Sequence, residues 1–139
     1  GHLGAVAALP DGSIVGATWG GRQLLRLSVD GEVLGKVEHT ARPFDTQDMQ
    51  RLDDRHILCS GIREAPTPGG RRGAVGGLAI ADADTLGFGW SMPVSLRSDE
   101  GNVLTRNPLC VELRDEQLVL VAVPDDGDGA LYECTVTPA

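Results

Sequence analysis

The stretch LPDGSIVGA (residues 9–17) recurs twice along the chain, as LDDRHILCS (52–60) and as LRDEQLVLV (113–121). Each copy starts with a leucine, carries an acidic residue two positions later and ends in an apolar run. We read the leucine as the end of one strand, the acidic residue and its neighbour as a tight turn, and the apolar run as the next strand. The chain therefore repeats a β-hairpin.

These hairpins divide the chain into three units. Residues 4–40 read as four short strands, with Asp30-Gly31 as a two-residue hairpin turn. Residues 45–94 read as four more, with a Pro- and Gly-rich surface loop inserted at 65–72. Residues 106–136 supply only three strands. The first two repeat leucines are 43 residues apart, which is the spacing of a four-stranded propeller blade, and the inserted loop and a longer link explain the next spacing of 61.

The predicted fold is all-β and β-propeller-like: two four-stranded antiparallel blades and a three-stranded partial third blade, in one partial domain over residues 1–139. No stretch has the apolar periodicity of a helix. Known propellers close with about four to eight blades, so we expect missing N-terminal blades or a homo-oligomeric partner to complete a ring. The open edge at residues 131–136 is where a fourth strand would add. A β-sandwich is the alternative fold.

Composition narrows the function classes. The net charge of −8 argues against nucleic acid, because phosphate binding needs clustered Lys and Arg. No apolar run approaches the ~20 residues of a membrane span. The three cysteines, Cys59, Cys110 and Cys134, lie in apolar runs without metal-ligand spacing. We expect them to be small buried residues in a reducing, cytoplasmic compartment.

Longer motifs carry a resemblance to a known family. FDTQDMQRLDDRHILCSG (44–61), GGLAIAD (76–82), LTRNPLCVEL (104–113) and VPDDGDGALYECTV (123–136) resemble, in the same order, the C-terminal half of an actinobacterial β-propeller family, the domain of unknown function DUF6454. The resemblance covers most of the chain. It implies a propeller lacking its N-terminal half, and it implies no activity and no catalytic residue.

Candidate site residues lie where the first strand of a blade begins, since those strands line the central channel of a propeller. Asp45, Gln47 and Asp48 lie there in the second unit, and Arg106 and Asn107 in the third. Asp45, Asp48 and Asn107 offer oxygen ligands suited to Ca²⁺, similar in kind to the set in calcium-dependent lactonase-type propellers. Gln47 and Arg106 would contact a ligand directly, with Arg106 as an anion clamp. The other interpretation is that these side chains hydrogen-bond loop backbone between blades.

Two functions remain open on the sequence. One is a ligand-binding or scaffold module without catalysis, because the repeat explains nearly every residue and no catalytic constellation is present. The alternative is a divalent-cation-dependent, lactonase-like hydrolase with its site at the mouth of the central channel, and Ca²⁺ is the only cofactor indicated. The sequence does not decide whether the protein is an enzyme.

Overall fold

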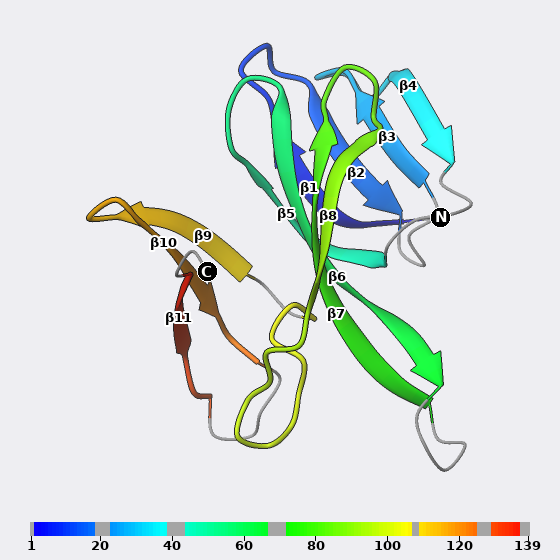
Figure 1. Ribbon diagram of the computed structural model, residues 1–139. Coiled ribbons are helices and arrows are strands. Elements are labelled where there is room, and N and C mark those ends of the chain that lie inside the picture. Colours follow the sequence, from blue (N-terminus) through cyan, green and yellow to red (C-terminus); the bar gives the residue numbers. More distant parts are fainter. Residues whose placement is uncertain are drawn as a thin grey trace.

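A computed structural model describes residues 2–18, 23–38, 44–66, 72–106, 109–124 and 129–136. Those ranges contain strands and no helix (Figure 1). The strands are β1 (Leu3–Ala8), β2 (Ile14–Thr18), β3 (Gln23–Leu27), β4 (Val33–Glu38), β5 (Asp45–Arg51), β6 (His56–Pro66), β7 (Arg72–Asp82), β8 (Phe88–Val94), β9 (Leu109–Arg114), β10 (Gln117–Ala122) and β11 (Tyr132–Val136). In the described part of the chain there is accordingly no helix that could cross a membrane.

The strands form three antiparallel sheets, each a meander in chain order. The first sheet is β1-β2-β3-β4, the second is β5-β6-β7-β8, and the third is β9-β10-β11. This confirms the predicted all-β, propeller-like organisation of two four-stranded units and one three-stranded unit. The β-sandwich alternative is wrong, because a sandwich has two sheets that face each other. Here the second sheet lies between the first and the third (Figure 1).

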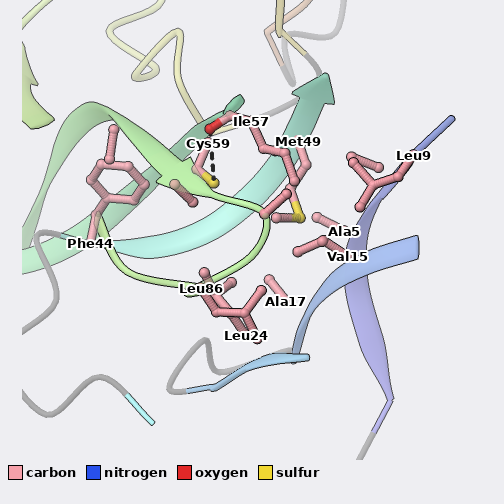
Figure 2. Close-up of a cluster of buried hydrophobic side chains, with 14 residues drawn as sticks. Ala5, Leu9, Val15, Ala17, Leu24, Phe44, Met49, Ile57, Cys59 and Leu86 are labelled. Carbon is pink, nitrogen blue, oxygen red and sulfur yellow. Dashed lines mark hydrogen bonds between the residues drawn. The ribbon is translucent and has the colours of Figure 1, made fainter. Parts of the chain in front are cut away.

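Alternating side chains of the second sheet explain this three-layer order. Ile57 and Cys59 pack toward the first sheet, whereas Leu58 between them packs toward the third. In β7, Ala79 and Leu78 divide in the same way, as a period of two residues requires. Figure 2 shows the first of these two cores, where side chains of the first and second sheets converge. Continuous apolar runs in β6 and β7 are therefore strands buried on both faces.

The hairpin turns of the first and second repeats each enclose three residues, and the third repeat differs; in the second, the N–H of Leu52 donates to the carbonyl of His56 (2.9 Å). In the first, the N–H of Leu9 donates to the carbonyl of Ser13 (2.8 Å), and Gly12 has a φ of 84°. The turn at Gly31 has the same form, because the N–H of Ser28 donates to the carbonyl of Glu32 (2.8 Å). The predicted two-residue turn at Asp30-Gly31 is thus wrong: the loop has three residues, with glycine in the left-handed position.

The third repeat does make a two-residue turn. Arg114 pairs with Gln117, and Asp115 (φ 50°) and Glu116 (φ 64°) fill the two corner positions. Both positions need left-handed backbone to match the right-handed twist of the strands. Glycine would adopt that backbone without strain, so this hairpin carries a conformational cost that the first repeat avoids.

The predicted inserted loop at 65–72 is shorter than expected. The β6–β7 register continues from His56↔Asp82 as far as Pro66↔Arg72, so the two ends of that stretch are paired strand. Residues 67–71 lie outside the described residues. The insertion consequently lengthens a hairpin, and in Figure 1 this hairpin projects away from the other strands.

Burial of the cysteines is only partly as expected. Cys59 is fully buried in the core between the first two sheets, Cys134 is half-buried, and Cys110 is exposed. The expectation of burial is wrong for Cys110, because its position alternates onto the solvent side of β9.

Candidate functional site

The first strands of the three sheets lie side by side, with β5 in contact with both β1 and β9. Asp48 Oδ2 accepts a hydrogen bond from the N–H of Leu109 (3.0 Å). Two residues further on, Gln50 Oε1 accepts from the N–H of Val111 (2.7 Å), and Gln50 Nε2 donates to the carbonyl of Val111 (2.8 Å). Both pairs are 61 residues apart, so β5 and β9 run parallel in a fixed register.

This offset equals the spacing between the second and third repeat leucines. Parallel strands in register place their starting ends at the same end of the molecule. Asp45 opens β5 and is half-buried, and Arg106 is exposed just before β9, where its N–H donates to the carbonyl of Val103 (3.2 Å). Asn107, the predicted third metal ligand, lies outside the described residues.

Gln47 and Asp48 lie at an irregularity of β5. The register shifts between Thr46, opposite Gly61, and Asp48, opposite Ser60, so Gln47 occupies a bulge. Both Gln47 and Asp48 are half-buried. The carboxylate of Asp48 bonds the backbone of β9 in the neighbouring sheet, whereas the second interpretation from the sequence expected a bond to loop backbone between blades. Among the described residues no group of three or more His, Cys, Asp or Glu is placed to hold a metal ion.

Ser60 is a polar residue in this region that the sequence did not single out. It is 2% exposed, and in the described part of the chain its hydroxyl has no hydrogen-bond partner. Its position opposite Asp48 puts it on the face of β6 that is turned toward the third sheet. A buried hydroxyl without a partner costs about 1–3 kcal/mol, so this is a polar defect beside the candidate site.

Thr105 was also missed, although it lies in the TRNP segment (105–108). It is fully buried, and its Oγ1 accepts from the N–H of Gly77 (3.1 Å) and donates to the carbonyl of Gly61 (2.8 Å). Gly61 and Gly77 are partners in the β6–β7 ladder. The loop before β9 is thus bonded to the backbone of the second sheet through one hydroxyl.

Glycines make this contact possible. A Cβ on Gly77 would lie 2.5 Å from Cδ1 of Phe44, and one on Gly76 would collide with Thr105 and Val103. The aromatic ring therefore packs directly on bare backbone on one face of the ladder, and the threonine does so on the other. The sequence signal is the Gly76-Gly77 pair inside a strand-like run, since glycine within a strand marks close approach of another group.

A pocket of about 170 Å³ lies on the second sheet, where residues of β6, β7 and β8 surround it beside Phe44. Val75, Pro93 and the Phe44 ring supply apolar walls, and Arg63 and Ser91 supply polar groups. This pocket is smaller than the ~300–1,000 Å³ usual for ligand pockets.

At the other end of β5, charged side chains connect the turns. Arg26 bonds Asp11 (2.8 Å) in the first sheet's hairpin and Asp84 (2.9 Å) in the β7–β8 turn. The hydroxyl of Ser13, then its N–H, and also Arg26 lower the pKa of Asp11. Arg26 joins two sheets at their turns, which is a structural role.

Two turn aspartates cap backbone in the second sheet. The N–H of Arg55, followed by the ring and N–H of His56, lowers the pKa of Asp53 to about 2. The N–H of Thr85 and then the Arg55 guanidinium lower the pKa of Asp82 to about 2. By accepting backbone hydrogen bonds, these carboxylates stabilise the β5–β6 and β7–β8 turns.

Three antiparallel meanders, stacked with their first strands side by side and joined by side-chain bonds, define an all-β, propeller-like protein. No protein-family model matches the chain, and no curated protein matches it. Among solved structures, the chain is similar to the WD40 domain of Pan2 from Neurospora crassa, with 10% sequence identity and a TM-score of 0.35. The match covers 98% of this chain and 53% of that one, so the chain spans about half the length of its structural neighbour.

Proposed function

We propose that this chain is a scaffold and ligand-binding segment of propeller type, without a catalytic centre of its own. The observation that carries the proposal is the use made of the polar side chains on β5. Asp48 and Gln50 are bonded to the backbone of β9, and so stabilise the contact between neighbouring sheets. Side chains used in this way hold the blades in register.

The ligand end of this scaffold is the shared starting end of the first strands. Asp45 opens β5 and Arg106 precedes β9, so both lie near this shared end. Gln47 lies at the bulge of β5, between Thr46 and Asp48. Bulges commonly redirect a side chain toward a site. We propose that Gln47 and Arg106 contact an anionic or polar ligand at this end.

Further blades are the proposed partners. β11 is an edge strand of a three-stranded sheet, and a fourth strand there would pair its free backbone groups. Missing N-terminal blades, or a homo-oligomeric partner, would supply it. The resemblance to the DUF6454 propellers supports the first source, and membership of that family is itself part of the proposal.

The competing hypothesis is a cation site at Asp45, Asp48 and Asn107 that serves a lactonase-like hydrolase. Melting of the chain in excess Ca²⁺ and in excess EDTA separates the two. A site that binds only the folded protein adds about 2.7 kcal/mol of stability when Ca²⁺ is at 100 times its Kd. The scaffold proposal expects equal melting temperatures in both conditions.

The variant Asp48→Ala sharpens this experiment. A scaffold role predicts a lower melting temperature by the same amount with Ca²⁺ and with EDTA, since the bond to Leu109 is lost in both. Asp54→Ala is the control, because that side chain is 91% exposed. A rise in melting temperature with Ca²⁺ that Asp48→Ala abolishes, and Asp54→Ala does not, would overturn the scaffold proposal.

A further inference from the structure

The outward side of the first sheet is apolar. Cross-strand pairing places Val6, Gly16 and Leu25 in one row on this side, and Ala8, Ile14, Leu27 and Val33 in the next. We call these residues the outer face of the first sheet. Val6 is 52% exposed and Val33 is 60% exposed, and the leucines and Ile14 between them are half-buried. The opposite face of the same strands forms the core with the second sheet.

Two apolar faces are not typical of a sheet at the end of a stack. An antiparallel sheet with one side in water alternates apolar and polar residues. The outward side of the third sheet is different: Val119 and Val121 of its central strand lie there beside Glu112, Arg114 and Glu133, and Arg114 bonds Glu112 (3.1 Å) and Glu133 (2.5 Å). The outward side of the third sheet therefore carries a network of ion pairs, whereas among the described strand residues the outward side of the first sheet carries charges only on β4.

We infer that the outer face of the first sheet binds the same face of a second copy of this chain, related by a two-fold axis. Sheet-on-sheet packing through apolar faces already joins the meanders within the chain. A second copy offers two outward faces. Its third sheet would bring the Arg114 ion pairs into an apolar interface, and desolvating such charges is costly. Its first sheet brings only matching apolar residues.

The margin of this face is self-complementary. Lys36 lies in the row of Leu25, and Glu38 lies opposite Gln23, so the edge strand β4 presents one charge of each sign. Both side chains are exposed. In a two-fold interface every contact occurs twice. Lys36 of each copy can therefore pair with Glu38 of the other, which gives two equivalent ion pairs. This inference uses no residue of the proposed ligand end. N-terminal blades, the other proposed partners, would pack on this same face, so the dimer is the alternative to them.

The test is the mass of the 139-residue chain by sedimentation velocity, from low micromolar to several hundred micromolar protein. We expect a reversible dimer. The double variant Val6→Lys, Val33→Lys should raise the dimer dissociation constant at least tenfold, and Thr135→Lys, on the outward side of the third sheet, should leave it unchanged. Circular dichroism melting confirms that each variant is folded.

A second measurement needs no variant. The methyl resonances of Val6 and Val33 should shift with protein concentration, and those of Val121, on the outward side of the third sheet, should not. A chain that stays monomeric at the highest concentration overturns the inference, and the face would then be covered by a blade from outside these residues. A dimer sensitive to Thr135→Lys and insensitive to the Val6 and Val33 changes also overturns it, because it shows head-to-tail contact.

Discussion

The side-chain amide of Gln50 pairs with both backbone groups of Val111, accepting from its N–H at 2.7 Å and donating to its carbonyl at 2.8 Å. The side-chain amide thus makes the two hydrogen bonds that a backbone amide of a neighbouring β-strand would make. It joins the first strands of two sheets that share no backbone ladder of their own. Together with Asp48, this glutamine holds the register between the two sheets.

Replacing this glutamine tests that role. Gln50→Leu keeps the approximate size of the side chain but leaves the N–H and carbonyl of Val111 without partners in a half-buried setting. We expect a loss of about 1–3 kcal/mol in the free energy of unfolding, measured by urea denaturation. Gln117→Leu, at an exposed position of β10, should change stability by less than about 0.5 kcal/mol. Equal effects of the two changes would contradict the role of Gln50.

The buried hydroxyl of Thr105 gives a second prediction. Thr105→Val retains the shape but removes the bonds to Gly77 and Gly61, so we expect a loss of about 2 kcal/mol. Thr105→Ser keeps the hydroxyl and should cost less. Amide hydrogen exchange at Gly77 should be faster in the valine variant, and unchanged exchange there would show that the ladder does not depend on Thr105. Thr135→Val, at an exposed site, is the matched control.

Gly77 lies directly beneath the Phe44 ring, so its replacement should affect stability differently from that of Gly89, which has open space around it. Gly77→Ala would put a Cβ at 2.5 Å from the ring, so we expect overpacking to cost about 1–3 kcal/mol. Gly89→Ala meets nothing within 4 Å and should be neutral or stabilising by about 0.5–1 kcal/mol. Adding Phe44→Leu should recover part of the Gly77→Ala loss in a double-mutant cycle. Additive effects would mean that the ring does not limit this position.

Acid should destabilise the protein through Asp53 and Asp82. Their pKa values in the folded state, about 2, lie below the ordinary 3.8, so the unfolded chain binds protons more readily. The stabilisation is present above pH 3.8 and is lost as the pH falls toward 2. The variant Asp53→Asn, Asp82→Asn should flatten the pH dependence of the unfolding free energy in this window. An unchanged slope, or equal flattening by Asp54→Asn, would count against the two turn caps.

The cysteines should differ in reactivity. Burial, with a smaller contribution from the charge of Asp48, raises the pKa of Cys59 to about 12. Cys110 is exposed. Iodoacetamide at mildly alkaline pH should therefore alkylate Cys110 first, and Cys59 only after unfolding, as peptide mass mapping would show. Rapid labelling of Cys59 in the folded protein would contradict the packing between the first and second sheets.

Much of the fold could be predicted from the repeat. Alternation and turn residues locate the strands, and the repeat spacing of 61 reappears as the offset between Asp48 and Leu109. The turn at Gly31 could not be distinguished from a two-residue turn, because Asp-Gly suits both forms and Ser28 with Glu32 closes the longer one. The extended β6–β7 hairpin was also missed, because proline and glycine normally indicate a loop.

The candidate site was predictable only in outline. Asp48 was chosen as a polar residue at the start of an inner strand, and the structure places it at the contact with β9. The roles of Thr105 and Gln50 depend on which backbone lies opposite them, and nothing in the local sequence specifies a partner 28 to 61 residues away.

The strand content, the three units and the two faces of each strand follow from the order of residues alone, because they depend on local backbone geometry and on side-chain alternation. The stacking of the sheets sets which polar side chains form hydrogen bonds between sheets and which apolar face points outward. Hydrogen bonding and burial depend on what packs against a residue. The residue that packs against it is set only when the sheets have stacked.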